Sequence, residues 1–277
     1  MGKLPTIAVC YIAAVDDSQL AERRGPTRMT DALPEYNIVD MRDRTPEDLS
    51  PSELEQLQDV EVAFILYMPD WLLAACPNLK WIHSFMTGHD HIPLPQLKER
   101  NIRLTNGAGT AAIEIAEFVI ARVLEHWKSF PQIAALQMEH KWRPVFGRAL
   151  SDAHIVLVGY GPINQQVARL LAPFDMRVTA VRRSATTPSP GANRVVAFAD
   201  LNAAMHDADI VVAAVPSNDD TTGMFNAEKF AAMQKGCLFI NVGRGTAVVE
   251  ADLIASLESG HLGGAAVDVA SEEPLPP

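Results

Sequence analysis

Residues 156–164, VLVGYGPIN, form the stretch whose residue types and spacing point most directly to chemistry. Gly159 and Gly161 follow an apolar run typical of a strand, and a run of helical composition begins at Pro162. Glycines at this spacing bring a backbone turn close to a pyrophosphate, and the amides at a helix N-terminus attract phosphate. Pro162 suits the first helical turn because an N–H there would have no helical partner. We therefore predict a dinucleotide-binding loop in which Gly159, Gly161, Pro162 and Ile163 contact the cofactor.

Asn164 occupies the position of the third glycine of the usual motif, where a glycine allows close helix–strand packing. We expect its side chain either to push the helix and strand slightly apart or to turn its amide toward the loop. The next predicted strand, residues 177–183, ends in Arg182 and Arg183, with no acidic residue for the ribose hydroxyls of NAD. Two guanidinium groups suit a 2′-phosphate. NADP is therefore the expected cofactor, and NAD is the alternative if the two arginines are only solvated.

The elements that must position this loop follow a regular rhythm along the chain. Short β-branched runs alternate with helix-period segments, which is typical of parallel sheets covered by helices. The predicted strands are residues 6–12, 36–41, 61–67, 79–85 and 102–106, followed by 154–160, 177–183, 194–198, 209–215, 236–242 and 263–269. We expect an α/β fold with two doubly wound parallel-sheet domains, a flavodoxin-like domain over residues 1–107 and a Rossmann domain over residues 108–277.

The segment between the two series, residues 109–127, has the spacing of one long helix. Its apolar side chains recur at steps of three and four, which predicts a buried helix connecting the domains. These side chains are Ile113, Ala116, Ile120, Val123, Leu124 and Trp127. Glu117 falls on the same stripe, where a carboxylate needs a partner, and we expect a structural partner rather than a catalytic role. Residues 137–153 have no period and predict a long connection.

Composition narrows the functional classes, because a net charge of −11 and a pI near 5.1 disfavour nucleic acid and anionic membranes as partners. The cysteines are Cys10, Cys76 and Cys237. Their wide spacing, with no C-x-x-C pair, argues against a disulfide framework or a zinc site. His89 and His91 lack further ligand spacing, so we expect an ordinary loop and no metal. The cysteine pattern favours a reducing compartment, and we find no membrane span or secretion signal in the sequence, so the cytoplasm is the expected location.

Six stretches of the sequence resemble the D-isomer-specific 2-hydroxyacid dehydrogenase family, which includes glyoxylate/hydroxypyruvate reductases. They are residues 79–92, 102–124, 156–164, 207–226, 233–269 and 271–276. The most specific pair is INVGRG, residues 240–245, with EEPLP, residues 272–276. The resemblance implies an NAD(P)-dependent enzyme that transfers hydride to a small 2-keto acid and forms the D-2-hydroxy acid. It also implies that the first domain binds the substrate and the second binds the cofactor.

By the same resemblance, Arg244 binds the substrate carboxylate and carbonyl, and Glu273 supports the catalytic histidine as an imidazolium acid. A guanidinium can hold a keto acid with paired donors while it polarises the carbonyl that receives hydride. Further cofactor contacts are implied at Val215, Pro216, Thr221, Val242 and Asp268, although strand core is an alternative for Val242. Backbone amides for the substrate carboxylate are implied at Met86, Thr87 and Gly88. Met86 and His89 replace smaller or aliphatic residues usual for the family, which predicts an unusual substrate pocket.

The resemblance also predicts what the sequence lacks. In the family, the acid histidine and a last helix that packs on the first domain follow the EEPLP stretch, and this sequence stops at Pro277. We therefore expect a chain truncated before its catalytic histidine, with little turnover. The alternative is a catalytically weak or inactive NAD(P)-sensing module of the same fold. A homodimer through residues 110–153 of the second domain is expected. The alternative for the aromatic residues there, Trp127, Phe130, Trp142 and Phe146, is burial within one chain.

Overall fold

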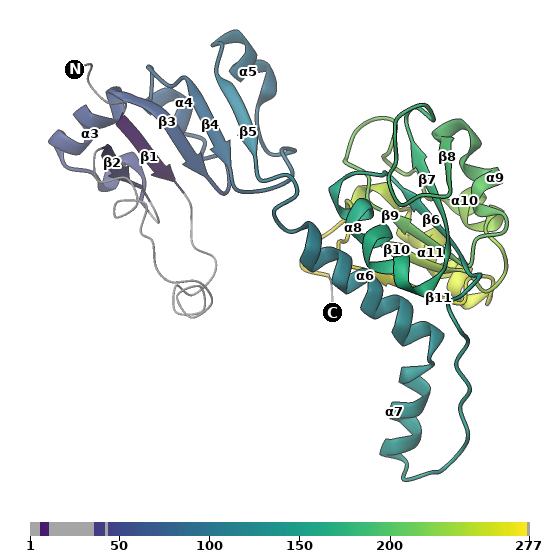
Figure 1. Ribbon diagram of the computed structural model, residues 1–277. Helices are drawn as coiled ribbons and strands as arrows, with labels where there is room; N and C mark the ends of the chain where they lie inside the picture. The colour runs from purple at the N-terminus through teal and green to yellow at the C-terminus, as the bar shows by residue number, and fades with distance from the viewer. Residues whose placement is uncertain (1–5, 11–35, 42–43, 276–277) are drawn as a thin grey trace. The chain divides into compact units, whose positions relative to one another are not determined.

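The computed structural model describes residues 6–10, 36–41 and 44–275, without the side chains of Val9 and Cys10. It divides into two compact units, Met1–Thr110 and Ala111–Pro277. Each unit is built on a sheet whose strands are all parallel (Figure 1). The predicted fold class is therefore confirmed. Residues 11 and 12 of the first predicted strand lie outside the described residues.

Unit 1 contains a five-stranded sheet with the order β2-β1-β3-β4-β5. This is the flavodoxin-like order of a doubly wound fold. The strands are β1 (Thr6–Cys10), β2 (Asn37–Asp40), β3 (Val60–Ile65), β4 (Trp81–Ser84) and β5 (Arg103–Asn106). The described helices are η1 (Pro46–Asp48), α3 (Pro51–Gln58), α4 (Leu72–Ala75) and α5 (Leu94–Glu99).

Local sequence signals explain where the helices of unit 1 begin. Helix α3 starts with Pro51 at its first position, and Ser50 forms a capping box with Glu53. The Ser50 hydroxyl and backbone and the Arg44 guanidinium hold the pKa of Glu53 at about 2, so that this carboxylate stays ionised. Helices α3, α4 and α5 contribute Leu57, Leu72 and Leu97 to the main core of the unit, which packs on one face of the sheet.

Unit 2 contains a six-stranded sheet with the order β11-β10-β9-β6-β7-β8. Counted from β6, this is the 3-2-1-4-5-6 order of the Rossmann fold, and the strand order reverses between β6 and β9. The strands are β6 (His154–Val158), β7 (Arg177–Arg182), β8 (Arg194–Ala197), β9 (Ile210–Ala213), β10 (Leu238–Asn241) and β11 (Gly264–Val267). Ligands bind such sheets at the carboxyl ends of the strands near the reversal point.

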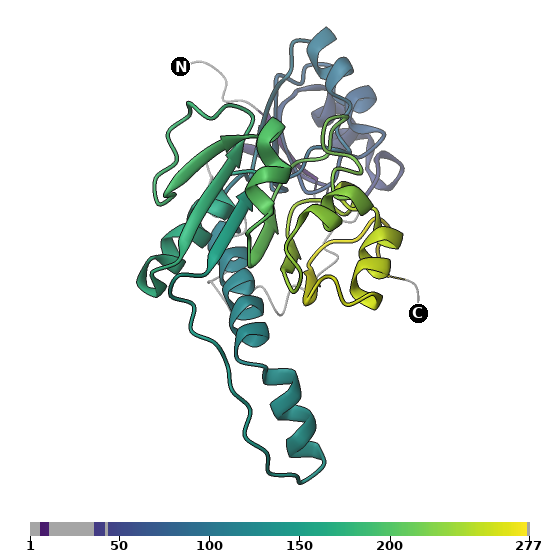
Figure 2. The same ribbon diagram turned by 90° about the vertical axis from the view of Figure 1, so that its right-hand side faces the viewer.

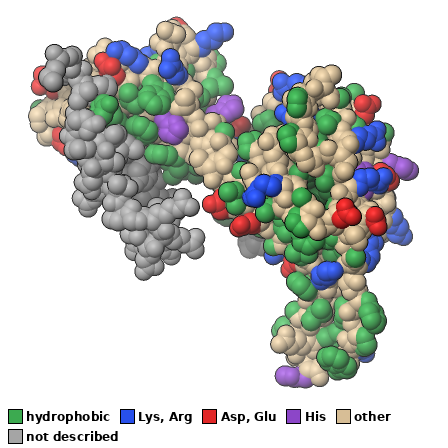
Figure 3. All heavy atoms as spheres, in the orientation of Figure 1, with side chains coloured by type: hydrophobic (Ala, Val, Ile, Leu, Met, Phe, Trp, Pro, Cys, Tyr) green, Lys and Arg blue, Asp and Glu red, His purple; other side chains and the backbone are tan. Residues whose placement is uncertain are grey.

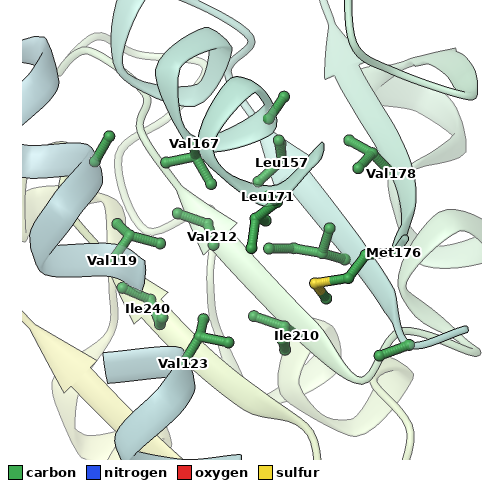
Figure 4. Close-up of a cluster of buried hydrophobic side chains, with 14 of the residues drawn as sticks. Val119, Val123, Leu157, Val167, Leu171, Met176, Val178, Ile210, Val212 and Ile240 are labelled. Atoms are coloured by element: carbon green, nitrogen blue, oxygen red, sulfur yellow. The ribbon is translucent and has the colours of Figure 1, made fainter. Parts of the chain in front are cut away.

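Helices cover both faces of the unit 2 sheet, because alternate residues of each strand point to opposite sides. On one face, Ile155 and Leu157 of β6 pack with α6 (Ala112–Trp127) and α8 (Pro162–Leu171) (Figure 4). On the other face, Val156 and Val158 pack with α9 (Leu201–Met205), α10 (Ala227–Ala232) and α11 (Glu250–Glu258). The short 3₁₀ helices are η2 (Ala172–Phe174), η3 (Phe198–Asp200) and η4 (Gly245–Ala247).

The connecting helix α6 forms where it was predicted, but its buried stripe is rotated. The buried side chains are Ala112, Ala116, Val119, Val123 and Trp127. Ile113 is 49% exposed, and Glu117 is also exposed. The expectation that Glu117 lies on a buried stripe and needs a partner is therefore wrong. The regular spacing left the choice between adjacent stripes open, and packing on α8 and the sheet selected the neighbouring one.

An arm extends from unit 2 between α6 and β6. Ser129, with φ of +54°, separates α6 from a second helix, α7 (Phe130–Met138). Residues 139–149 then return without regular structure, so most of the predicted long connection is confirmed (Figure 2). Among the described helices, none combines the length and apolar character that spanning a membrane requires.

Candidate active site

The predicted cofactor contacts of unit 2 gather at one edge of its sheet. Because the strands are parallel, their carboxyl ends meet at the same edge. Gly159 follows β6, Arg182 ends β7 and Val215 follows β9. Arg244 follows β10, and Asp268 follows β11. The fold thus brings together residues that lie far apart in the sequence, at the edge where α/β sheets bind ligands.

The two glycines of the loop after β6 serve different purposes. Gly159 has φ of +81°, and a Cβ there would lie 2.5 Å from the Ala214 carbonyl oxygen, so both strain and space require glycine. A Cβ on Gly161 would meet no atom within 4 Å. Gly161 is the N-cap of α8, whose first residue is Pro162, as predicted. The open space at Gly161 fits a dinucleotide pyrophosphate approaching the backbone and the helix N-terminus.

Asn164 lies fully buried under this loop. Its Nδ2 donates hydrogen bonds to the carbonyl oxygens of Val158 at 3.2 Å and Gly159 at 3.1 Å. Of the two expectations for this residue, the one in which the amide turns toward the loop is confirmed. The Asn164 side chain therefore joins α8 to the end of β6 by hydrogen bonds, where a glycine would let the helix and strand backbones touch.

Arg244 lies on a turn held by two glycines and a buried asparagine. Asn241, the last residue of β10, donates through Nδ2 to the Arg244 carbonyl oxygen at 3.0 Å and accepts from the Gly243 N–H at 3.1 Å. A Cβ on Gly243 would lie 2.6 Å from a backbone oxygen after β9, and one on Gly245 would overlap the backbone of Ala270. Arg244 is half-buried, and its Nη1 donates to the Gly243 carbonyl oxygen at 2.8 Å.

The segment after β11 meets this turn at Gly245. Glu273 is exposed, and its Oε1 accepts a hydrogen bond from the Ala270 N–H at 2.8 Å. The next amide, that of Ser271, donates to Oε1 of Glu250 on α11 at 2.8 Å. Arg244 and Glu273 thus lie on adjoining segments of one edge, and the support of a histidine by Glu273 stays a prediction.

Thr221 shapes the loop that follows β9. Its buried hydroxyl donates to the Pro216 carbonyl oxygen at 2.6 Å and accepts from the Asn218 N–H at 3.0 Å. These bonds close the loop on itself. The loop lies beside the turn of Arg244, since the hydroxyl groups of Ser217 and Thr246 are 3.0 Å apart. Cofactor contact by Pro216 and Thr221 stays a prediction.

The remaining predicted cofactor residues differ in exposure. The side chains of Val215 and Val242 are buried in the two cores of the unit, so only their backbone atoms can face a ligand. The alternative expectation for Val242, that it belongs to the hydrophobic core, therefore holds for its side chain. Asp268 is exposed at the end of β11, and its N–H donates to the Asn241 carbonyl oxygen at 2.9 Å. Its carboxylate is available to a ligand at this edge.

The two arginines after β7 are arranged differently. Arg182 is half-buried, and its Nη1 donates to the Pro188 carbonyl oxygen at 3.0 Å. Arg183 is exposed and is followed by Ser184 and Thr186, whose hydroxyls lie 2.8 Å apart. The sequence pattern predicted the same role for both guanidinium groups. In the structure, Arg182 is hydrogen-bonded to the loop that follows β7, whereas Arg183 is exposed to solvent.

In unit 1, the predicted anion-binding loop follows β4 at the carboxyl edge of that sheet. Asn106 at the end of β5 donates to the Thr87 carbonyl oxygen at 2.7 Å and so fixes the loop. The Met86 N–H donates to the Ser84 hydroxyl at 3.2 Å. The N–H groups of Thr87 and Gly88 have no acceptor among the described residues. Of the three predicted amides, those of Thr87 and Gly88 are therefore without an intramolecular acceptor in the described part of the chain, and substrate contact by this loop stays a prediction.

The histidines of unit 2 lie away from the carboxyl edge. His154 is buried at the start of β6, with Nε2 2.8 Å from the Thr179 hydroxyl and Nδ1 3.1 Å from the Asp207 carboxylate. Burial, and secondarily Arg177, lower the pKa of His154 despite Asp207, so the ring is neutral at pH 7 and the Asp207 contact is a hydrogen bond. His126 lies in the last turn of α6, beside Gly264 at the start of β11, and His140 lies on the arm. His206 and His261 come shortly before β9 and β11.

Two residues that hold the site were not singled out from the sequence. Asn241 lies inside the quoted INVGRG stretch, but only its two side-chain hydrogen bonds show that it holds the Arg244 turn. Tyr160, between the two glycines, is buried, and its hydroxyl donates to the Pro190 carbonyl oxygen at 2.5 Å. A polar amide before a glycine turn could have indicated Asn241. No sequence signal connects Tyr160 with a loop thirty residues away.

The described residues contain no group of three or more metal-ligating side chains. His89 and His91 lie exposed in a loop of unit 1, and the ring of His91 packs 5.6 Å from that of Tyr67. Cys76 and Cys237 are buried as free thiols, and burial raises the pKa of each to about 12. The side chain of Cys10 lies outside the described residues.

Comparison with protein families gives a match over residues 120–277 to the D-isomer specific 2-hydroxyacid dehydrogenase NAD binding domain. A glyoxylate reductase of Thermofilum pendens is 32% identical over 83% of this chain and 71% of its own length. The human glyoxylate reductase/hydroxypyruvate reductase is 30% identical over 73% of the chain. The match spans only 63% of the length of the human protein.

Solved structures of the same kind share the fold. A D-isomer specific 2-hydroxyacid dehydrogenase from Xanthobacter autotrophicus, in complex with NADPH and MES, is 26% identical with a TM-score of 0.80. It matches over 99% of this chain and 83% of its own. An NADPH-dependent glyoxylate/hydroxypyruvate reductase from Sinorhizobium meliloti, in complex with NADP and sulfate, is 29% identical with a TM-score of 0.80. It matches over 99% of this chain and 84% of its own.

Proposed function

We propose that this chain, which belongs to the D-isomer specific 2-hydroxyacid dehydrogenase family, reduces a small 2-keto acid of the glyoxylate or hydroxypyruvate type to the D-2-hydroxy acid. The observation that carries the proposal is the carboxyl edge of unit 2. An open glycine loop for a dinucleotide follows β6, and an arginine on a hydrogen-bonded turn follows β10, at the same edge of one sheet with β9 between the two strands. The names of the relatives support the substrate class.

Arg244 is proposed to orient the keto acid. The Asn241 hydrogen bond and the close packing of Gly245 fix the Arg244 backbone, so the point from which the guanidinium side chain extends is fixed. Fork-shaped donors bind a carboxylate and carbonyl oxygen together, and they stabilise the negative charge that develops on the carbonyl oxygen. In unit 1, the amides of Thr87 and Gly88 are proposed to bind the substrate carboxylate, as small loop residues allow an anion close approach.

The cofactor is proposed to be NADPH, which supplies a hydride when bound. Gly159, Gly161 and the N-terminus of α8 would hold its pyrophosphate. Arg183, with the hydroxyls of Ser184 and Thr186, would hold the 2′-phosphate. The backbones at Val215, Pro216 and Val242 and the carboxylate of Asp268 would contact the adenosine and nicotinamide parts. Two solved relatives hold NADPH or NADP, which supports this preference.

The proton for the new alkoxide is proposed to come from outside unit 2. None of its described histidines lies at the carboxyl edge, and His154 is held in the core at the opposite end of β6. Glu273, exposed at the correct edge, would stabilise the imidazolium form of an acid histidine. An NAD(P)-sensing module of low activity is the second candidate function, and it would use the same open glycine loop and the N-terminus of α8.

A homodimer through the arm is also proposed. The side chains of Trp142 and Phe146 are 93% and 88% exposed, and Phe130 is 52% exposed, whereas Trp127 is buried. Burial within one chain therefore accounts for Trp127 alone. Hydrophobic side chains cover much of the arm surface (Figure 3). Exposed aromatic residues in one patch are typical of protein interfaces.

The test is a titration of the protein with NADPH and NADH, followed by assays with glyoxylate, hydroxypyruvate and larger 2-keto acids. We expect NADPH binding and consumption of NADPH with the small acids. Arg244→Gln should lower kcat/KM by roughly 10²–10³, because the lost donors act on the transition state, while the Kd for NADPH stays within about twofold. NADPH binding without turnover of any keto acid would favour the sensor. Failure of both nucleotides to bind would reject both functions.

A further inference from the structure

The loop between β7 and β8, residues 183–193, is held to unit 2 by side chains from other elements. Its last part packs on α8, because Gly191 has φ of +85° and a Cβ there would lie 3.3 Å from the Ala168 Cβ and 3.4 Å from the Tyr160 hydroxyl. The Asn193 side chain accepts a hydrogen bond from the Val178 N–H at 2.7 Å. The loop is therefore anchored at its return to the sheet.

Tyr160 provides the contact between this loop and the glycine loop. Its ring is buried in the core on the α6 and α8 side of the sheet, with 2% of its surface exposed. Its hydroxyl donates to the Pro190 carbonyl oxygen at 2.5 Å. Burial raises the pKa of the phenol, so it stays protonated and can donate. Because Tyr160 lies between Gly159 and Gly161, one side chain links the pyrophosphate loop to the loop after β7.

Arg182 holds the same loop from its other end. Its Nη1 donates to the Pro188 carbonyl oxygen at 3.0 Å and approaches the Ser189 hydroxyl at 3.4 Å. The two clamped carbonyl groups, those of Pro188 and Pro190, are two residues apart. The exposed part of the loop, Arg183 with the hydroxyls of Ser184 and Thr186, is the part that carries groups for a phosphate monoester.

We propose that Tyr160 is a specificity-determining positioning residue: its hydroxyl holds the 183–193 loop so that Arg183, Ser184 and Thr186 face the 2′-phosphate of NADPH. The inference rests on the proposed NADPH-dependent function. Arg182 is assigned a second positioning role and not direct phosphate binding. NADH has no phosphate at this position, so its affinity depends on the glycine loop and not on the position of Arg183.

The test compares Tyr160→Phe with the wild-type chain by fluorescence or calorimetric titration with NADPH and NADH. Tyr160→Phe keeps the buried ring and removes only the hydroxyl. We expect the Kd for NADPH to rise about three- to tenfold, the range of one hydrogen bond, while the Kd for NADH changes less than about twofold. Tyr67→Phe, which removes a phenol hydroxyl from the surface of unit 1, is the matched control and should leave both constants unchanged.

A double-mutant cycle identifies the route of the effect. In an Arg183→Gln background, Tyr160→Phe should change the ratio of the two Kd values by less than about twofold, because the group that it positions is gone. An unchanged ratio of the two Kd values in Tyr160→Phe would overturn the inference, whether both affinities fall equally or neither changes. Either result leaves the proposed function standing if the wild-type chain binds NADPH. Absence of nucleotide binding in the wild-type chain would instead reject the proposed function itself.

Discussion

The sheets of the two units differ in how their faces are covered. In unit 2 both faces carry large buried clusters, one with α6 and α8 and the other with α9, α10 and α11. In the described part of unit 1 the cluster against α3, α4 and α5 is large, and the opposite cluster has only Ile7 and Val62 as buried members. Parallel sheets are normally covered on both faces.

The second face of the unit 1 sheet carries aromatic and polar side chains. The strand register places Trp81 opposite Arg103 and His83 opposite both Phe64 and Thr105, so that these side chains share one face. Trp81 is 37% exposed, and its Nε1 donates to the Thr105 hydroxyl at 2.8 Å. In the part of the chain that the structure describes, core side chains therefore cover both faces of the unit 2 sheet, whereas one face of the unit 1 sheet carries mainly aromatic and polar side chains.

The largest effect is expected in the core of unit 2. Phe239 is fully buried between Phe225 and Phe230, with ring centroids 5.0 and 5.3 Å away. Phe239→Ala should lower the free energy of unfolding by about 3–5 kcal/mol, because it leaves a cavity. Urea unfolding followed by circular dichroism measures this. Trp81→Ala in unit 1 should cost much less, and an equal cost would mean that the exposed face is covered in solution.

A smaller effect is expected from the two glycines of the nucleotide loop, and it separates folding from binding. Gly159→Ala should lower the free energy of unfolding by about 1–3 kcal/mol, since alanine is strained at positive φ and would contact the Ala214 carbonyl oxygen. Gly161→Ala should leave the thermal midpoint unchanged and raise the Kd for NADPH about tenfold, because its methyl group projects into open space. Thermal unfolding measures the stability of both variants, and nucleotide titration measures their Kd for NADPH. Reversed outcomes would contradict this division of roles.

Acid should destabilise unit 2 through His154, whose pKa is lowered by burial and by Arg177. The unfolded chain, with an ordinary histidine pKa of about 6.5, binds the proton more readily. The stability that the neutral ring contributes is therefore present above that pH and is lost as the pH falls below it. Thermal midpoints measured from pH 8 to pH 5 should fall less steeply in His154→Gln.

The pH experiment also tests whether His154 serves only the fold. Because the ring lies at the opposite end of β6 from the glycine loop, kcat at pH 7 should be the same in His154→Gln and the wild-type chain. Burial also lowers the pKa of His126, so a residual slope with the same sign is expected in the variant. Parallel slopes in the two proteins, or a loss of kcat, would assign His154 a different role.

The smallest effect on stability is expected at the arm. Trp142→Ser and Phe146→Ser should change the free energy of unfolding of the monomer by no more than about 0.5 kcal/mol, because both side chains are exposed. Sedimentation velocity should show a shift from dimer to monomer in these variants. Ile254→Ser, at an exposed apolar position of α11, is the matched control and should remain dimeric. A wild-type chain that sediments as a monomer would refute the dimer.

Much of the fold could be predicted from local pattern. The rhythm of apolar runs indicated every described strand of both sheets, and Pro162 after a glycine marked the start of α8. The pattern was insufficient for α6, where two adjacent stripes had similar apolar content and only contact with α8 and the sheet selected the buried one. The consequence for Glu117, exposed rather than buried, follows from that single rotation.

The candidate site shows the same limit at the level of single side chains. The motif identified Arg182 and Arg183 as a pair, but only their hydrogen bonds separate a loop clamp from an exposed guanidinium. The three amides near Thr87 were also predicted together, and one of them, that of Met86, is occupied by the Ser84 hydroxyl. Side-chain hydrogen bonds in loops leave no periodic signal in the sequence, even where the partners lie only two or six residues apart, so they could not be predicted.

The sequence by itself determined the alternation of strands and helices, the glycine turn after β6 and the residue types at the carboxyl edge. It could do so because these features depend on short-range periodicity and on the conformational freedom of glycine and proline. Tertiary structure alone decided which faces are buried, which amides are free to bind and which loop Tyr160 holds. Those outcomes depend on contacts between segments that only the folded chain brings together.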